Sequence, residues 1–456
     1  AIEMRLHLDW LALPFLITEA GVTLLAIVYT WGYYANGRLA EETDPSTTRG
    51  ANGHRPRNRI AYFYALLLLF AVGMSGTTLA DDMILFYTFW ELMLVASAVL
   101  ILVWGEAVKG GPRKQTVTLK YFIFTHMGSL LILIALLILY DAVGSDSFSA
   151  LRQGVTLAPA LVTTVTTLFL IGFCVKMAIF PLHLWLPDAH TVAPMPVTIM
   201  LAAAMLSMGT YGILRFPMSL FSRAQMQAFA TPMMIAGILS EVYGALMALA
   251  EQDIKRIVAY SSVSQMGYIL FGLGTLTADG VAGATLHVIY HAIVKALLFM
   301  VLGLVIHATG QRHIDKLGGL SRVMPVTAAC AFIGALAMAG MPPLCIFDSE
   351  WMIFAGGFHT GHIALSAATL FGSLLTVAYA LWLVARIFLG ASVDVKRDLA
   401  QQEVEDRATF PEGDRPLAML VPTVILAVLT IVEGLFPAPL FDWVMHELPL
   451  LLGGQW

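Results

Sequence analysis

The sequence predicts an all-α, polytopic membrane protein. Of its 456 residues, 59% are hydrophobic and only 12% are charged, and the mean hydropathy is +0.80. Soluble domains have roughly 45–50% apolar and about 25% charged residues. The apolar residues also form runs of about 20, the length that crosses a bilayer as a helix. One helical bundle therefore accounts for the chain, and its small net charge of −5 indicates no particular partner.

The apolar runs predict twelve spans, two of which are interrupted by proline. The predicted spans are 11–35, 60–79, 82–104, 118–142, 157–192, 193–216, 229–250, 257–275, 281–308, 324–357, 364–386 and 416–436. Each continuous run is close to the roughly 20 residues that a membrane helix needs. The two interrupted runs, 157–192 and 324–357, are longer because each contains a break.

The first interrupted span, 157–192, is the predicted functional centre. It begins with LVTTVTTLFLIGFCV, contains Lys176 and breaks at Pro181, after which PLHLWLPDAHTVAPMP follows. A charge at membrane depth costs about 2.5–3.5 kcal/mol on insertion scales, so it usually lines a pathway or pairs with another group. Irregular backbone at that depth is tolerated where it is buried in protein or borders a water-filled cavity.

Basic residues in the connecting loops predict the orientation. Eighteen lysines and arginines fall on one side of the predicted spans, and the other side receives only Arg5, Arg152, Arg215 and Arg223. By the positive-inside rule, the basic side is cytoplasmic. We therefore expect a multi-pass protein of the cell (inner) membrane, with both termini on the outer side and basic cytoplasmic loops at 36–59 and 387–415.

Two groups of five predicted spans follow the same order. Residues 60–216 and 229–386 each have a broken span in fourth place, the second with the sequence AMAGMPPLCIFDSEWMIF. Because five is odd, the second group starts from the opposite side and is inverted. Inverted repeats with discontinuous helices are typical of transporters. Residues 1–59 add the first span and a basic loop, and residues 387–456 add a loop and the C-terminal span.

The sequence contains no motif for a cofactor or a metal. Cys174, Cys330 and Cys345 lie in apolar runs without CxxC spacing, which argues against a cluster, a zinc site or a disulfide framework. There is no GxGxxG or GxxxxGK[ST] motif, so we expect no nucleotide site, and no nucleic-acid partner. The chain opens with AIEMRLHLDWL, without an initiator methionine or a visible signal peptide. We therefore expect either that the chain has been processed or that this sequence starts inside a longer product.

Ionisable side chains at membrane depth form the candidate site. They are Glu91, Lys176, His287, His291, Lys295 and Glu350, with Glu241 as a further carboxylate. His287, His291 and Lys295 are spaced at i, i+4 and i+8, so they share one helix face. A carboxylate beside a lysine favours the charged ammonium, and loss of that contact favours release of the proton. Histidine titrates near neutrality. We interpret the set as a proton relay.

Each candidate also has a structural interpretation. Glu91 and Lys176 could form a fixed ion pair. Four further candidates could have a structural role alone, as a hydrogen bond to the backbone, a position at the membrane interface or a packing contact. They are His287, His291, Glu350 and Glu241. Three residues lie where the chain leaves the first break, and they could either cap the broken helix or take up protons: His183, Asp188 and His190.

Four motifs resemble the antiporter-like subunits of the complex I superfamily. They are FWELM, CVKMAIFPLHLWLPDAHTVAP, EQDIKRIVAYSSVSQMGY and HAIVKALLFMVLG, and the resemblance runs from about residue 8 to residue 436. The superfamily includes the large membrane subunits of NADH–quinone oxidoreductase, the large Mrp Na⁺/H⁺ antiporter subunits and their equivalents in membrane-bound hydrogenases. The KMxxxPLHxWLPDAHxxAP pattern is specific to this group.

The resemblance implies roles for the candidate residues. Glu91 matches the essential glutamate of the family, and Lys176 matches the lysine with which it pairs. Lys295, with His287 and His291, matches the central relay, whereas Glu350 matches the terminal carrier. The His-x3-His-x3-Lys helix resembles the distal complex I subunit or the Mrp and hydrogenase proteins, while Glu350 and FWELM resemble the complex I subunit that ends its path in glutamate.

Three features depart from the family pattern. Ser207 stands where members commonly have lysine, so the link from Lys176 to the histidines would use water, organised by Ser207 and Thr210, or run through Glu241. Gln265 stands where many members have histidine, and it cannot titrate. The first span also aligns with the third helix of a fourteen-helix core, so two leading helices and the long amphipathic arm are missing from this sequence.

We therefore predict a proton-translocating membrane subunit of a complex I-like, redox-driven pump. The resemblance implies that iron–sulfur, flavin or metal centres lie only on partner subunits, including a peripheral redox arm. It also implies homologous antiporter-like subunits as neighbours in the bilayer. An Mrp-type Na⁺/H⁺ antiporter subunit without a redox arm is the alternative, and a scaffold with a vestigial path is a third interpretation.

Overall fold

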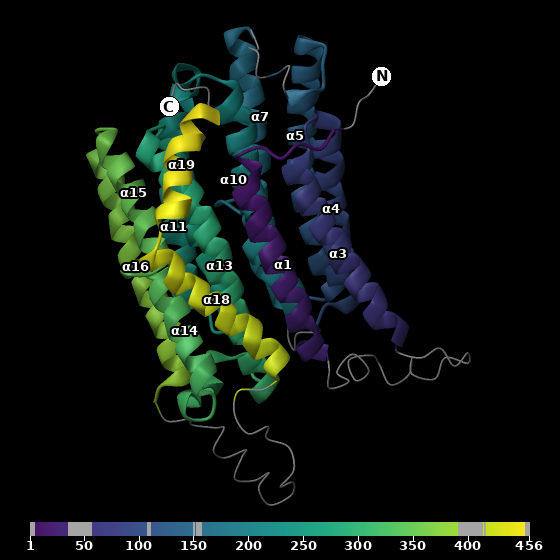
Figure 1. Ribbon diagram of the computed structural model, residues 1–456, viewed down its shortest axis with the longest axis vertical. Helices are drawn as coiled ribbons and strands as arrows, with labels where there is room; N and C mark the ends of the chain where they lie inside the picture. Colours follow the sequence, from purple (N-terminus) through teal and green to yellow (C-terminus); the bar gives the residue numbers. More distant parts are fainter. Residues whose placement is uncertain are drawn as a thin grey trace, which may run out of the picture.

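A computed structural model describes residues 5–34, 57–106, 111–148, 151, 157–390, 414 and 416–451. This part of the chain is an all-α bundle, with isolated bridges between single residues and no β-strand (Figure 1). The predicted fold class is confirmed. Most of the predicted loops 36–59 and 387–415 lies outside the described residues.

Eleven helices in the described part are long and apolar enough to cross a membrane. They are α1 (Ala12–Tyr34), α3 (Arg57–Leu79), α4 (Met83–Trp104), α5 (Lys114–Val143), α7 (Pro159–Met177), the composite helix Met195–Met218, α11 (Arg223–Ala250), α12 (Ile254–Gly274), α13 (Ala278–Thr309), α16 (Ile363–Phe388) and α18 (Leu417–Leu435). The twelfth predicted span is a pair of shorter helices, α14 (Pro325–Met338) and α15 (Cys345–His359). Each predicted span thus coincides with a helix or a broken pair.

Both predicted breaks are present. Helix α7 ends at Met177, the next residue has a left-handed φ of 57°, and the chain resumes as the short α8 (Leu186–Val192). In the second break, α14 ends at Met338, and Gly340 has a φ of 63° before α15 begins. A left-handed residue ends a helix because it turns the chain away from the helix axis.

The composite helix Met195–Met218 is also irregular. It consists of α9 (Met195–Met200), the π-helical turn η1 (Leu201–Met205), α10 (Ser207–Ile213) and a second π-helical turn η2 (Leu214–Met218). Wide turns of this kind inside α-helices occur frequently at functional sites. Here the first wide turn comes directly before Ser207.

The helices of residues 57–218 and 223–388 follow the same order, with the broken pair in fourth place in each group. The end of α3 lies beside the start of the chain, because the His7 amide donates to the Leu79 carbonyl at 2.8 Å. Arg215, near the end of the composite helix, binds Asp9 in the same region. Helix α11 therefore starts at the end of the bundle where α3 finishes, as an inverted order requires.

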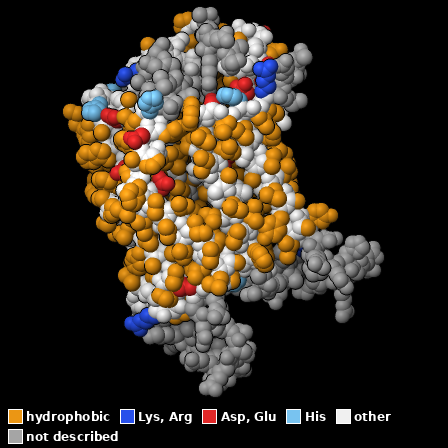
Figure 2. Space-filling view, viewed as in Figure 1, with side chains coloured by type: hydrophobic (Ala, Val, Ile, Leu, Met, Phe, Trp, Pro, Cys, Tyr) orange, Lys and Arg blue, Asp and Glu red, His pale blue; other side chains and the backbone are white. Residues whose placement is uncertain are grey.

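Burial separates a central set of helices from a surrounding set. The composite helix and α12 are entirely buried in the bundle, and α13 is buried over most of its length. The surrounding helices expose large apolar side chains, for example Trp31 (72%), Phe371 (61%) and Leu137 (57%). Hydrophobic side chains cover the middle of the face in Figure 2, and Lys and Arg lie near its ends. A band of apolar side chains of this kind is expected where helices contact lipid.

The sequence analysis did not predict α19 (Ala438–Leu451) as a separate element. This helix follows Pro437 directly after α18 and lies at the same end of the bundle as the start of α1 (Figure 1). It was missed because it is too short to count as a span and follows the last apolar run without a polar gap.

Ion pairs at the opposite end of the bundle join the two groups of helices. Glu106, just after α4, accepts hydrogen bonds from Lys255 of α12 at 3.1 Å and from Tyr33 of α1 at 2.6 Å. The Lys255 ammonium also donates to the Ala193 carbonyl at 2.9 Å, and Arg312 lies 3.5 Å from Glu106. Lys255 is fully buried. This cluster surrounds a buried cation of the second group with hydrogen-bond acceptors from the first group.

Helices α11 and α12 can pack as closely as they do only because residue 237 is glycine. A Cβ atom there would lie 2.7 Å from the Gly267 carbonyl oxygen and from the Phe271 amide nitrogen. We expect Gly237→Ala to destabilise the protein by about 1–3 kcal/mol through overpacking, measured as a lower thermal midpoint in detergent. Gly21→Ala is the control, since a Cβ there meets nothing within 4 Å. Equal midpoints for the two variants would contradict this packing.

The ion-pair cluster makes a second stability prediction. Removing one partner of a buried ion pair leaves an uncompensated charge, which costs about 3–5 kcal/mol. Lys255→Met should lower the free energy of unfolding by about this amount, measured by chemical unfolding in detergent. The double variant Glu106→Gln/Lys255→Met should recover part of the loss, and the partly exposed Lys114→Met should have little effect. A double variant as unstable as Lys255→Met would refute the pairing.

Candidate functional site

Glu91 lies in the middle of α4 and faces α5. Its Oε2 atom is 3.2 Å from Nδ1 of His126, and its Oε1 atom is buried without a hydrogen-bond partner among the described residues. The sequence analysis did not include His126 in the candidate site, because it is 35 residues from Glu91 in the sequence. The signal was present, however, since His126 is itself a titratable residue in the apolar run of α5.

Lys176 lies in the last turn of α7, directly before the first break, and is 3% exposed. Its ammonium lies 5.1 Å from the centroid of the Trp90 ring, and the Trp90 indole is held by a 3.0 Å hydrogen bond to Ser129. Lys176 is within electrostatic range of Glu91, but no ion pair joins the two in the described structure. The predicted direct pairing is therefore replaced here by a cation–π contact, which attracts a cation without a counter-charge.

The first break is anchored to both groups of helices. The Phe180 amide donates to the Ser240 hydroxyl of α11 at 3.2 Å, and the Trp185 indole donates to the Val175 carbonyl at 3.0 Å. The ring of His183 lies 4.8 Å from that of Tyr243, and neither of its nitrogens has a hydrogen-bond partner among the described residues. His183 therefore does not cap the broken helix.

Asp188 and His190 differ in their surroundings. Asp188 bridges Lys120 of α5, at 2.8 Å, and Arg256 of α12, at 2.9 Å. It thus joins helices of the two groups instead of capping α8. His190 is fully buried, stacks on Phe299 at 5.1 Å, and has no hydrogen bond to either ring nitrogen in the described part of the chain.

Lys295, His291 and His287 line one face of α13, as their spacing predicted, and all three are fully buried. The Lys295 ammonium donates to the Ser261 hydroxyl and lies 3.4 Å from the Val258 carbonyl. Among the described residues, His291 has no hydrogen-bond partner on either nitrogen.

His287 is the fixed member of this face. Its Nε2 is 2.9 Å from the Gln265 side-chain oxygen, and its Nδ1 is 3.0 Å from the Ser349 hydroxyl. Gln265, which departs from the family pattern, therefore orients a histidine instead of titrating itself. Ser349 precedes Glu350, so His287 contacts the second broken pair.

Glu350 packs into the second break. It is 5% exposed, and its Oε1 is buried without a hydrogen-bond partner in the described structure. A Cβ atom at Gly340 would lie 2.2 Å from its Oε2, so only glycine leaves space for this carboxylate. The break thus makes room for an ionisable group at membrane depth.

Glu241 of α11 lies on the side of the bundle that faces Glu350. A Cβ atom at Gly372 of α16 would lie 1.7 Å from its Oε1, and neither oxygen has a hydrogen-bond partner among the described residues. The first break instead contacts Ser240, the preceding residue. Adjacent helix residues point in different directions, and the Glu241 carboxylate lies against Gly372 of α16.

Ser207 and Thr210 lie on α10. The Ser207 hydroxyl donates its hydrogen to the Ala204 carbonyl of its own helix at 2.5 Å, so it has no hydrogen left to donate to another acceptor. The Thr210 hydroxyl is buried and has no partner among the described residues. Of these two hydroxyls, Thr210 is the one free to bind water.

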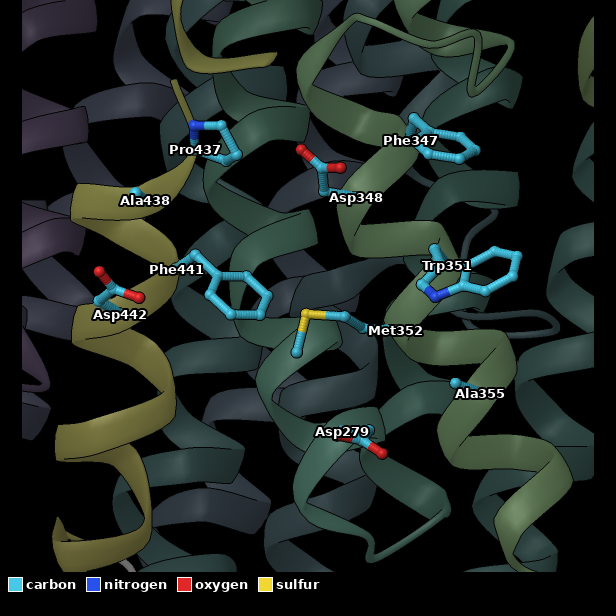
Figure 3. Close-up of a pocket in the computed structure, with 10 residues that line it drawn as sticks. All are labelled: Asp279, Phe347, Asp348, Trp351, Met352, Ala355, Pro437, Ala438, Phe441 and Asp442. Atoms are coloured by element: carbon cyan, nitrogen blue, oxygen red, sulfur yellow. The ribbon is translucent and has the colours of Figure 1, made fainter. Parts of the chain in front are cut away.

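A groove of about 580 Å³ opens beside the second broken pair, between α15 and α19. Phe441 of α19 and Met352 of α15 point toward one another across it (Figure 3). Asp348 also lines the groove, whereas Glu350, two residues further along α15, points into the bundle. Residues two apart on a helix do not share a face, so α15 presents one carboxylate to each side.

Comparison with known proteins shows the family of the chain. The family described as NADH:quinone oxidoreductase/Mrp antiporter, TM, matches residues 80–376. The NAD(P)H-quinone oxidoreductase chain 4 1 of Synechococcus sp. (strain JA-3-3Ab) is 36% identical over 398 residues, which cover 85% of this chain and 69% of the relative. The NADH-quinone oxidoreductase subunit M of Pseudomonas aeruginosa is 34% identical over 392 residues, which cover 85% of this chain and 74% of the relative.

Solved structures share the fold over nearly the whole chain. A chain of the membrane-bound sulfane sulfur reductase, an archaeal respiratory membrane complex, is 28% identical with a TM-score of 0.81, covering 97% of this chain and 67% of that one. A chain of the Mrp complex from Dietzia sp. DQ12-45-1b is 24% identical with a TM-score of 0.82, covering 99% of this chain and 85% of that one, and supports the fold alone. The chain belongs to the NADH:quinone oxidoreductase/Mrp antiporter family.

Proposed function

We propose that this chain is the proton-translocating membrane subunit of a complex I-like, redox-driven assembly. The observation that carries the proposal is Lys295, which is fully buried and touches a hydroxyl and a carbonyl but no carboxylate in the described structure. An ammonium without a counter-ion at low dielectric is costly. Its protonation therefore responds strongly to any charge that approaches, and a proton carrier needs this property.

The proposed route uses both broken pairs. A charge that forms or disappears at Glu91 acts on Lys176, which has no ion-pair partner in the described structure. Protons then pass by way of ordered water to His291 and Lys295, which lie one helical turn apart. They leave through His287 and Ser349, which precedes Glu350, toward the outer side. Histidine can serve in such a chain because it both donates and accepts protons near neutral pH.

Redox chemistry belongs, in this proposal, to partner subunits that carry the iron–sulfur, flavin or metal centres. The named relatives are parts of quinone oxidoreductases, and the solved structures with this fold are multisubunit membrane complexes. Neighbouring antiporter-like subunits would pass charge shifts to Glu91.

We also propose that the end of the bundle bearing Arg322 is cytoplasmic and that the end bearing Arg223 is outside. Both arginines are exposed, and the positive-inside rule places the more basic loops inside. A membrane-impermeant maleimide added to intact cells should label Arg223→Cys and not Arg322→Cys, while permeabilised cells should label both. The reverse pattern would show that the orientation is inverted.

Lysine substitutions test the proposed transport. In the whole assembly reconstituted into vesicles, Lys176→Ala and Lys295→Ala should each reduce proton translocation to about a tenth or less, the change that a barrier higher by about 1.4 kcal/mol produces. Lys114→Ala, a substitution near the helix ends, should leave translocation unchanged. Undiminished proton flux in Lys176→Ala vesicles would refute the proposed relay.

The second candidate is an Mrp-type Na⁺/H⁺ antiporter subunit without a redox arm. The family covers both classes, and the fold matches the Mrp complex over nearly the whole chain. Gentle solubilisation of native membranes and identification of the co-purified subunits separates the two. Iron–sulfur subunits would support the redox-driven pump. Polytopic subunits alone, together with Na⁺-dependent dissipation of a pH gradient, would support the antiporter.

A further inference from the structure

Glu19 is a buried carboxylate that the route above does not use. It lies in α1, seven residues after Ala12, which is about 10 Å along the helix at about 1.5 Å per residue, and it is 1% exposed. The signal for it was a single glutamate inside an apolar span. Its Oε1 accepts a hydrogen bond from the Thr78 hydroxyl at 3.0 Å, and its Oε2 is buried without a partner among the described residues.

The surroundings of Glu19 contain no cation that pairs with it in the described structure. The nearest arginine in this network is Arg215, which binds Asp9 with two hydrogen bonds and is thereby neutralised. An isolated carboxylate buried in this way takes up a proton instead of remaining charged. Burial without a counter-ion therefore favours the protonated carboxyl of Glu19, and its Oε2 has no hydrogen-bond partner among the described residues.

Thr78 can act on either side of such an exchange. Its hydroxyl lies 3.0 Å from Glu19 and 3.1 Å from the Met74 carbonyl, and it has one hydrogen to donate. When that hydrogen points to Met74, the hydroxyl can accept a hydrogen bond from the protonated carboxyl of Glu19. When it points to Glu19, it stabilises the ionised carboxylate. Rotation of the Thr78 hydroxyl therefore lets it form a hydrogen bond with either protonation state of Glu19.

The neighbours of Glu19 connect the membrane interior with the outer end of the bundle. The Thr78 hydroxyl also lies 3.7 Å from the Met208 sulfur, and Met208 follows Ser207 on α10. The Tyr211 hydroxyl, one turn along, donates to the Thr78 carbonyl at 2.6 Å. Arg215 in turn donates to the Tyr211 hydroxyl at 2.9 Å. This series ends at Asp9, which lies just before α1.

The composite helix itself lacks a suitable carrier here. Between Met195 and Met218 its sequence has no carboxylate, histidine or lysine. Its contacts with α1 and α3 supply one, because the Thr78 hydroxyl joins Glu19 to Met208 of this helix. Sodium is a poorer occupant for this site, since a hard cation needs several oxygen ligands and one of the neighbours is the sulfur of Met208.

We propose that Glu19 is a proton-carrying residue, which exchanges protons between the membrane interior beside Met208 and the outer end of the bundle marked by Tyr211, Arg215 and Asp9. This inference rests on the proposed function of proton translocation. In each exchange the proton leaves Oε2 of Glu19 to a water molecule, and a proton delivered by water from the other side restores the acid. The number of protons on Glu19 is unchanged over a cycle.

The test uses the whole assembly in vesicles with Glu19→Gln. Glutamine keeps the size of the side chain and can still accept the hydrogen bond from Thr78, but it cannot ionise. Proton translocation should fall about tenfold relative to the parent, equivalent to about 1.4 kcal/mol in the barrier, while Glu19→Asp should retain most of it. Glu433→Gln, a partly buried carboxylate of α18, is the matched control and should translocate normally. Infrared difference spectra should lose a protonated-carboxyl band in Glu19→Gln.

Several outcomes would overturn the inference. Normal translocation in Glu19→Gln, or in Glu19→Met if the glutamine variant does not assemble, means that the carboxyl group is not a carrier. Loss of Na⁺ transport alone, with H⁺ translocation intact, would identify a cation site instead. Lys176→Ala is measured in parallel. If Lys176→Ala loses transport and Glu19→Gln does not, only the role of Glu19 fails, whereas normal transport in Lys176→Ala contradicts the proposed function itself.

Discussion

The architecture depends on the cost of placing ionisable side chains inside a bilayer. Lys176, His291, Lys295 and Glu350 are all buried, and none has an ion-pair partner in the described structure. Lipid cannot solvate such groups. The bundle meets this constraint by enclosing the composite helix, α12 and α13 within a ring of helices that carry apolar side chains to the outside. The central helices can therefore carry ionisable side chains at a depth where the lipid-facing helices around them cannot.

The two broken pairs are a second consequence of the same constraint. A continuous helix satisfies its own backbone but leaves little space beside it. At the second break, Gly340 gives space to the Glu350 carboxylate, and at the first break Lys176 lies where α7 ends. A backbone group freed by the first break finds a partner on another helix, since the Phe180 amide donates a hydrogen bond to the Ser240 hydroxyl of α11. Each break thus creates a polar site that neighbouring helices complete.

The two groups of helices are joined by charges near one end of the bundle. Asp188 holds Lys120 and Arg256, and Glu106 holds Lys255 and Arg312, so each carboxylate links cations across the chain. Charges fixed in this way keep the groups in register. In the interior, by contrast, Lys176 contacts an aromatic ring, and Lys295 contacts a hydroxyl and a carbonyl, so neither ammonium is fixed by a counter-charge in the described structure. The protein therefore separates structural ion pairs from titratable groups by position.

The sequence by itself determined the fold class, the twelve spans, both breaks and the shared face of His287, His291 and Lys295. These follow from local properties, namely run length, proline position and the helical period. Only the tertiary structure decided which side chains meet. It placed His126 beside Glu91, Trp90 over Lys176, and Thr78 beside Glu19, because such contacts join residues that are far apart or on different helices. It also placed the Glu241 carboxylate against Gly372 of α16, since a direction around a helix axis depends on packing that no single run of residues contains.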